Sequence, residues 1–145
     1  MKAAGGTLAV ALALAVAGCS SPAWNDRDYE LKAAASAGTA ASAVGAARLA
    51  VAGGDRLTRP YLKVVLTGAA EQVQGVNDQF GGVQPPSERA QELGEALLRV
   101  TERAEKTVSG LLVQVRRDRV RDPGAAVRDL AAIGESLRRF EDEHG

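Results

Sequence analysis

Cys19 and His144 are the only cysteine and the only histidine in this chain of 145 residues. A single cysteine excludes an internal disulfide and a thiolate metal cluster. A single histidine excludes the usual histidine metal sites and disfavours a Ser-His-Asp catalytic arrangement. The acidic residues also lack the Glu-x-x-His pairs of di-iron bundles. We therefore predict that the protein is not an enzyme and that it holds neither a metal ion nor another cofactor.

Cys19 follows an apolar run whose position and length indicate a leader segment. Lys2 supplies a positive charge, and residues 8–17 (LAVALALAVA) fall short of the roughly 20 apolar residues that span a bilayer. The run ends in Val16-Ala17-Gly18-Cys19, which resembles the lipobox of bacterial lipoproteins. The resemblance implies that the Cys19 thiol receives a diacylglycerol and that the chain is cut directly before it. An ordinary secretory signal that contains a cysteine by chance is the alternative interpretation.

The lipobox resemblance also predicts where the protein resides. Residues 1–18 would be a signal peptide, and residues 19–24 a lipidated cysteine with a short tether. Two or three acyl chains, palmitate among them, hold a protein at a membrane firmly where one chain does not. The five tether residues after Cys19 reach at most about 17 Å. We expect a domain on the extracytoplasmic face of the cell membrane, anchored through lipid on Cys19 and working close to that surface.

Arginines near residue 120 are the second group that could do chemistry, because guanidinium groups bind carboxylates and phosphates. The run Arg116-Arg117-Asp118-Arg119-Val120-Arg121 predicts a site for an anion or a partner at Arg116, Arg117, Arg119 and Arg121. The partner would be an envelope protein or an anionic wall polymer. A formal net charge of zero argues against a nucleic-acid partner. The simpler interpretation is a solvated helix end, since basic residues there complement the helix dipole.

Four amphipathic segments must position these residues, over about 26–52, 59–80, 88–121 and 124–142. Each follows a capping residue, and apolar residues recur within it at intervals of three and four. No alternating pattern of β-branched residues predicts a strand. Because short connections make successive helices antiparallel neighbours, we predict an all-α, antiparallel up-down four-helix bundle as a single domain over residues 25–145. The capping residues are Asn25, Thr58, Ser87 and Asp122.

Two features of these segments have consequences for packing. The third helix would be about 51 Å long and the fourth about 28 Å, so either Gly110 bends the third helix or its arginine-rich end overhangs the bundle. Residues 33–47 carry no charge and almost no large side chain, which predicts a closely packed helix, with a partner-binding face as the alternative. The second helix is expected to bury Tyr61, Val65, Ala69, Val73, Val76 and Phe80.

The up-down topology would bring residues 52–58 and 116–124 together at the end of the bundle far from Cys19. That end would carry nine basic and four acidic residues, a net charge of +5, against −6 for the rest of the mature chain. The neutral total then divides into an acidic body and a basic tip. The basic residues are Arg48, Arg56, Arg59, Lys63, Arg116, Arg117, Arg119, Arg121 and Arg128, and the acidic ones are Asp55, Asp118, Asp122 and Asp129.

Composition indicates the kind of organism and protein. Arginine supplies 14 of the 18 basic residues, a bias typical of high-GC bacterial genomes. With the turn Val83-Gln84-Pro85-Pro86-Ser87 between two amphipathic helices, the chain resembles small helical lipoproteins of actinobacteria. That resemblance implies attachment to the outer face of the cytoplasmic membrane and no particular activity. We predict a non-catalytic interaction or scaffold domain at the cell envelope; the alternative is a bundle that binds or senses a small molecule between its helices.

Overall fold

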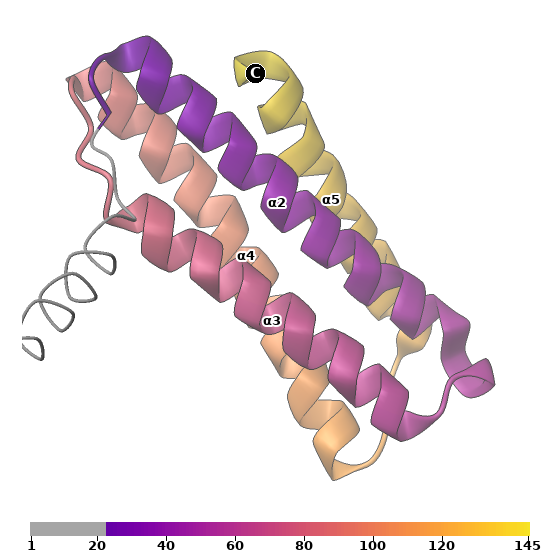
Figure 1. The fold of residues 1–145 in the computed structure, drawn as a ribbon. Helices are drawn as coiled ribbons and strands as arrows, with labels where there is room; N and C mark the ends of the chain where they lie inside the picture. The colour runs from indigo at the N-terminus through magenta and orange to yellow at the C-terminus, as the bar shows by residue number, and fades with distance from the viewer. Residues whose placement is uncertain (1–22) are drawn as a thin grey trace, which may run out of the picture.

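The computed structural model describes residues 23–145, which form four long α-helices and one turn of 3₁₀-helix (Figure 1). The prediction of an all-α, antiparallel four-helix bundle is confirmed. Cys19, the predicted signal peptide and most of the predicted tether lie outside the described residues. The helices are α2 (Asp26–Gly53), α3 (Arg59–Gly81), α4 (Glu88–Arg117) and α5 (Pro123–His144), and the 3₁₀ turn η1 (Gly54–Arg56) follows α2.

A side-chain cap begins each helix, as the sequence predicts. The side-chain oxygen of the cap accepts a hydrogen bond from the backbone N–H three residues further on, which satisfies a donor that the first turn leaves free. Gly54 ends α2 with a φ of 50°, a left-handed conformation that glycine adopts without strain. The four bonds are Asp28 N–H to Asn25 (2.9 Å), Tyr61 N–H to Thr58 (3.4 Å), Ala90 N–H to Ser87 (3.1 Å) and Ala125 N–H to Asp122 (2.8 Å).

Helix α2 packs against all three other helices, and most extensively against α5 (Figure 1). Its buried face consists mainly of alanine, so few side-chain atoms separate its backbone from its neighbours. Val44 of α2 lies beside Gly134 of α5, where a Cβ atom would be 3.7 Å from Val44 Cγ1, an ordinary van der Waals contact. Close packing of residues 33–47 is thus confirmed. Thr39 and Ser42 lie on the exposed side and donate to backbone carbonyls one turn earlier, and a partner-binding role for that side stays a prediction.

Tyr29 and Phe80 form an aromatic contact near the N-terminus of α2, with ring centroids 5.2 Å apart. Both side chains are 3% exposed. Burial raises the pKa of the Tyr29 phenol above its ordinary value of 10.0. Gly94 of α4 faces the Tyr29 hydroxyl, and a Cβ atom at this position would overlap it. The buried tyrosine therefore depends on a glycine in the neighbouring helix.

The buried face of α3 differs from the predicted one at the start of the helix. Tyr61 is 56% exposed and Val65 is half-buried, whereas Leu66 is fully buried. The prediction was wrong for Tyr61 because Leu62 and Leu66 fit the spacing of three and four equally well, and they occupy the inward positions instead. From Ala69 onward the predicted positions are buried.

Helix α4 ends at Arg117, four residues before the predicted end. It has 30 residues against 22 in α5, which correspond to about 45 Å and about 33 Å. The helix continues through Gly110, and its last turns extend beyond the start of α5, so residues 118–122 run back along the bundle (Figure 1). The overhang is therefore confirmed, and a returning connection replaces the last predicted helical turn.

Replacing Gly94 with alanine should destabilise the bundle, because the added methyl group displaces the buried Tyr29 ring. We expect the free energy of unfolding to fall by about 1–3 kcal/mol, the usual effect of overpacking. Gly110→Ala is the matched control in the same helix, since a Cβ atom there meets nothing within 4 Å. It should raise the free energy of unfolding by about 0.5–1 kcal/mol through the better helix propensity of alanine. Urea unfolding followed by circular dichroism measures both variants, and the same sign of change in both would contradict the packing argument.

The first turn of α2 contains a hydrogen-bonded carboxylate. Asp28 accepts a bond from Lys32 Nζ at 3.1 Å and another from the Trp24 backbone N–H at 3.1 Å. The bond from Lys32, followed by that from Trp24, lowers the pKa of Asp28 below its ordinary value of 3.8. Because the folded-state pKa is depressed, the ionised carboxylate stabilises the fold at pH values above 3.8. That contribution is lost as the pH falls through the lowered pKa.

Asp28→Asn should lower the melting temperature at pH 7, because the charge-assisted bond from Lys32 is lost. The difference from the parent chain should shrink as the pH falls through the lowered pKa of Asp28, because the parent carboxyl group is then protonated as well. Asp26→Asn is the control in the same turn, since no ion pair involves Asp26 among the described residues. Thermal melts between pH 2 and 7 test this, and a difference independent of pH would contradict it.

Candidate functional site

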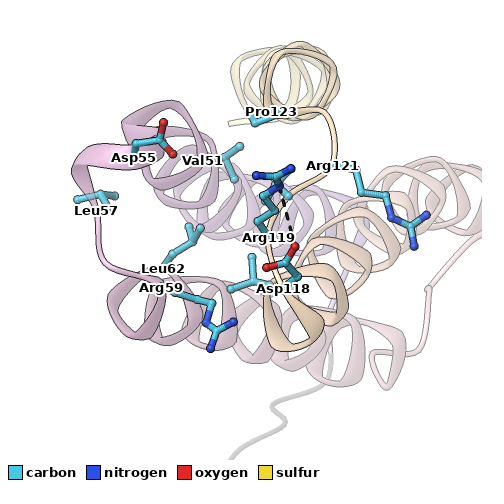
Figure 2. Close-up of a pocket in the computed structure, with 12 residues that line it drawn as sticks. Val51, Asp55, Leu57, Arg59, Leu62, Asp118, Arg119, Arg121 and Pro123 are labelled. Carbon is cyan, nitrogen blue, oxygen red and sulfur yellow. Dashed lines mark ion pairs between the residues drawn. The ribbon is translucent and has the colours of Figure 1, made fainter.

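The two connections at the end of the bundle far from Asp26 lie side by side. One joins α2 to α3 and contains η1, and the other joins α4 to α5 through residues 118–122. Residues of both connections line one cavity, in agreement with the predicted topology (Figure 2). We call this end of the bundle the distal tip: residues 54–58, residues 118–122 and the adjoining helix turns.

The connection over residues 118–122 is held by one residue of α4, Gln114. The backbone carbonyl of Gln114 accepts a bond from the Asp118 N–H at 2.9 Å, and its side-chain oxygen accepts one from the Arg121 N–H at 2.9 Å. Between them, Val120 is only 8% exposed and belongs to the hydrophobic core. The connection is therefore held at both ends and in its middle, so the backbone of Arg119 and of Arg121 has a defined position.

The cavity between the two connections, which we call the tip cleft, has a volume of about 430 Å³. Its floor is apolar and is formed by Val51, Leu62, Val115 and Val120, three of which are less than 9% exposed. A volume of this size lies within the range of about 300–1,000 Å³ that is usual for small-molecule sites. The charged residues around the floor are Asp55, Arg59, Asp118, Arg119 and Arg121.

Three arginines against two aspartates give the tip cleft one net positive charge. Arg119 Nε lies 4.0 Å from the Asp118 carboxylate, and both side chains are at least 80% exposed, so this ion pair contributes little. Arg59 takes part in no ion pair among the described residues. Figure 2 shows Arg119 over the cleft between Asp118 and Pro123, whereas Arg59 and Arg121 extend away from it in different directions. The cleft thus has one arginine directly over it, Arg119, and no strong ion pair within residues 23–145 holds its donors or those of Arg59.

The structure divides the arginine site that the sequence predicts. Arg119 and Arg121 line the tip cleft, and Arg117 joins them around a neighbouring hollow of about 460 Å³. Arg116 lines neither cavity, because successive residues at the end of α4 point in directions about 100° apart. All four are exposed. Sequence reasoning did not assign Arg59 to this site, although it counted that residue in the positive charge of the tip.

Exposed apolar side chains gather near the same end of the bundle. Six large apolar residues are exposed among the described residues, and four of them lie within two turns of the helix ends at the tip. Positive charge and apolar surface together are typical of a binding surface, whereas a solvated helix end needs only the charge. The four residues are Leu49, Tyr61, Val64 and Val113.

Neither a metal centre nor a membrane-spanning helix occurs in residues 23–145. No three His, Cys, Asp or Glu side chains in that part of the chain are grouped so that they could hold a metal ion. None of its helices is both long enough and apolar enough to cross a bilayer. Comparison of the chain with protein-family models, with curated proteins and with solved structures finds no match.

Proposed function

We propose that the protein is a lipid-anchored, non-catalytic interaction domain of the cell envelope, and that its distal tip binds an anionic partner. The observation that carries this proposal is the tip cleft, where two connections distant in sequence bring arginines around an apolar floor. The partner is an envelope protein or an anionic wall polymer. Arg119 and Arg59 contribute the positive charge nearest to the cleft, and Arg117 and Arg121 extend it to the neighbouring hollow.

The length of α2 supports the proposal that the lipid anchor and the binding surface lie at opposite ends of the bundle. The helix begins seven residues after Cys19, and its 28 residues span about 42 Å before the tip. A lipid on Cys19 would hold the N-terminal end of α2 close to the membrane. The tip would then face away from the membrane at roughly that distance, where it can meet envelope components.

The charge distribution supports the same orientation. Outside the tip the mature chain carries a net charge of −6. Helix α5 ends in Glu141-Asp142-Glu143 next to the start of α2, where the Arg27 guanidinium donates to the backbone oxygens of His144 and Gly145 at 3.4 Å each. Anionic lipid head groups repel an acidic end over about 8 Å at physiological ionic strength. This repulsion favours an upright bundle with its basic tip directed outward.

A small-molecule-binding bundle is the second candidate, and the volume of the tip cleft favours it. The cleft lies at the end of the bundle, whereas the middle of the core is filled by residues such as Ala37, Val44 and Leu97, each 0% exposed. A ligand would therefore bind at the tip and not between the helices. The two candidates share this site, and they differ in whether a macromolecule or a small molecule occupies it.

Replacing Cys19 with serine should abolish lipidation, because serine has no thiol to accept the diacylglycerol. Cells fed an alkyne analogue of palmitate should label the parent chain, and the Cys19→Ser variant should lose essentially all of this label. Ser21→Ala is the control in the same segment and should label like the parent chain. Label is read by fluorescence after gel separation, which does not depend on whether the leader is still attached. An unlabelled parent chain would contradict the lipid anchor.

Reversing the charges of Arg116, Arg117, Arg119 and Arg121 to glutamate should reduce retention of the full chain on isolated cell-wall material by about tenfold or more. High salt should reduce retention of the parent chain in the same direction. The matched control reverses four arginines on the body of the bundle, Arg99, Arg103, Arg138 and Arg139, and so changes the net charge by the same amount.

Two results would contradict a binding role for the tip: unchanged retention of the tip variant, or equal losses in the tip and body variants. Circular dichroism melts verify that both variants are folded. Glutamate at the end of α4 opposes the helix dipole. A variant with glutamine at the same four tip positions therefore repeats the measurement without that effect, and we expect it to show a smaller loss in the same direction.

A further inference from the structure

We infer that the tip cleft binds a small amphipathic anion: a singly charged carboxylate carried on a short apolar body. The apolar body would lie on the valine and leucine floor, and the carboxylate would lie beside Arg119, with Arg59 adding positive charge to the lining. This inference rests on the proposed function of the distal tip as an anion-binding end, and it specifies the chemistry of the group that the cleft accepts.

The floor of the cleft argues for an apolar component in the ligand. Val51 and Val115 are 2% and 1% exposed, and Val120 is 8% exposed, so the core holds these side chains in place. Leu62 completes the floor from α3 and is half-buried. Transfer of a ligand's apolar body from water onto this surface is favourable in proportion to the apolar area covered. A purely polar anion would leave the floor unused.

The arginines around the cleft argue for an anionic component. Arg59 forms no ion pair among the described residues, and the only ion pair of Arg119 is the exposed one to its neighbour Asp118. Their guanidinium groups can therefore donate to a ligand without breaking a strong interaction. A carboxylate matches the planar donor fork of arginine.

The aspartates limit the charge of the ligand. Asp55 and Asp118 lie on the same rim, so the cleft carries one net positive charge and not three. A monoanion is balanced by this charge. A phosphate monoester, with about −1.5 to −2 charges near pH 7, would leave negative charge unbalanced at the rim and would cost more to desolvate. The rim therefore favours a carboxylate over a phosphate monoester.

N-acetyl-leucine is a suitable probe, because it combines a carboxylate with a branched apolar side chain and stays in water. Saturation-transfer NMR is carried out on the full chain reconstituted in nanodiscs of zwitterionic lipid, with empty nanodiscs as the blank. It should give a dissociation constant of about 1–10 mM for N-acetyl-leucine. N-acetyl-leucinamide lacks the charge, and N-acetylglycine lacks the apolar side chain. Each should bind at least about fivefold more weakly, as should butyl phosphate, which carries the larger charge.

Variants of the rim should shift this affinity in opposite directions. Arg119→Gln should weaken binding of N-acetyl-leucine by about tenfold, because a charge-assisted bond is lost. Arg59→Gln should weaken it by less, because only a more distant charge is lost. Asp118→Asn should tighten it by about two- to fivefold, because Arg119 loses its competing carboxylate. Arg103→Gln removes the same charge from an exposed position in the middle of α4 and should leave the affinity unchanged.

Equal binding of the acid and its amide, or equal effects of Arg119→Gln and Arg103→Gln, would overturn the inference. Its failure is distinguishable from failure of the proposed function. If retention on cell-wall material depends on the tip arginines while N-acetyl-leucine does not bind, the inference of an amphipathic ligand is wrong. The proposal of a macromolecular partner is then retained. If N-acetyl-leucine binds and responds to the rim variants while retention does not, the cleft inference stands and the proposed wall partner is wrong.

Discussion

The small side chains of α2 are the constraint on which the rest of the structure depends. Alanine along the buried face allows the backbone of α2 to approach the other three helices, and α5 most extensively. Because α2 fills little volume, larger side chains on the other helices complete the core, among them Leu66, Leu97 and Leu130. Where α2 does bury a large side chain, at Tyr29, the neighbouring helix has a glycine, Gly94, that leaves room for the hydroxyl. A helix with ordinary leucine positions would hold its neighbours further apart.

The distal tip follows from a difference in length between two helices of this bundle. Since α4 extends beyond the start of α5, the chain must run back over residues 118–122 before α5 can begin. Val120 fills the end of the core during this return, and Gln114 fixes the connection through its backbone and side-chain oxygens. The returning connection meets the one after α2, and the tip cleft lies between them. A shorter α4 would join α5 by a simple turn, and Arg119 would then have no apolar floor beside it.

Local sequence signals predict most of this fold, because caps and helix ends depend on residues that are close in the chain. All four caps, the three-and-four spacing in α2 and the meeting of the two connections are as the sequence indicates. Two features depend on contacts between residues that are far apart in the sequence, so neighbouring residues in the chain do not predict them. Tyr61 and Leu62 both fit the periodicity of α3, and packing against the neighbouring helices decides that Tyr61 is exposed. Likewise, arginines and Val120 continue the helical pattern of α4, whereas burial of Val120 in the core and the bond from the Arg121 N–H to the Gln114 side chain stabilise the returning connection.

The two ends of the bundle differ in how their charges are paired, and not only in their net charge. Near the start of α2, Glu30 lies 3.6 Å from Arg27 and 3.4 Å from Arg89, and Lys32 lies 3.1 Å from Asp28. The Glu30–Arg89 pair links α2 to α4, and the bonds from Arg27 link α2 to the end of α5, so cations at this end stabilise contacts between helices. At the tip, the one ion pair among the described residues joins the sequence neighbours Asp118 and Arg119 at 4.0 Å. Such a pair stabilises no contact between helices, so the tip arginines contribute little to the stability of the fold and their guanidinium donors remain accessible.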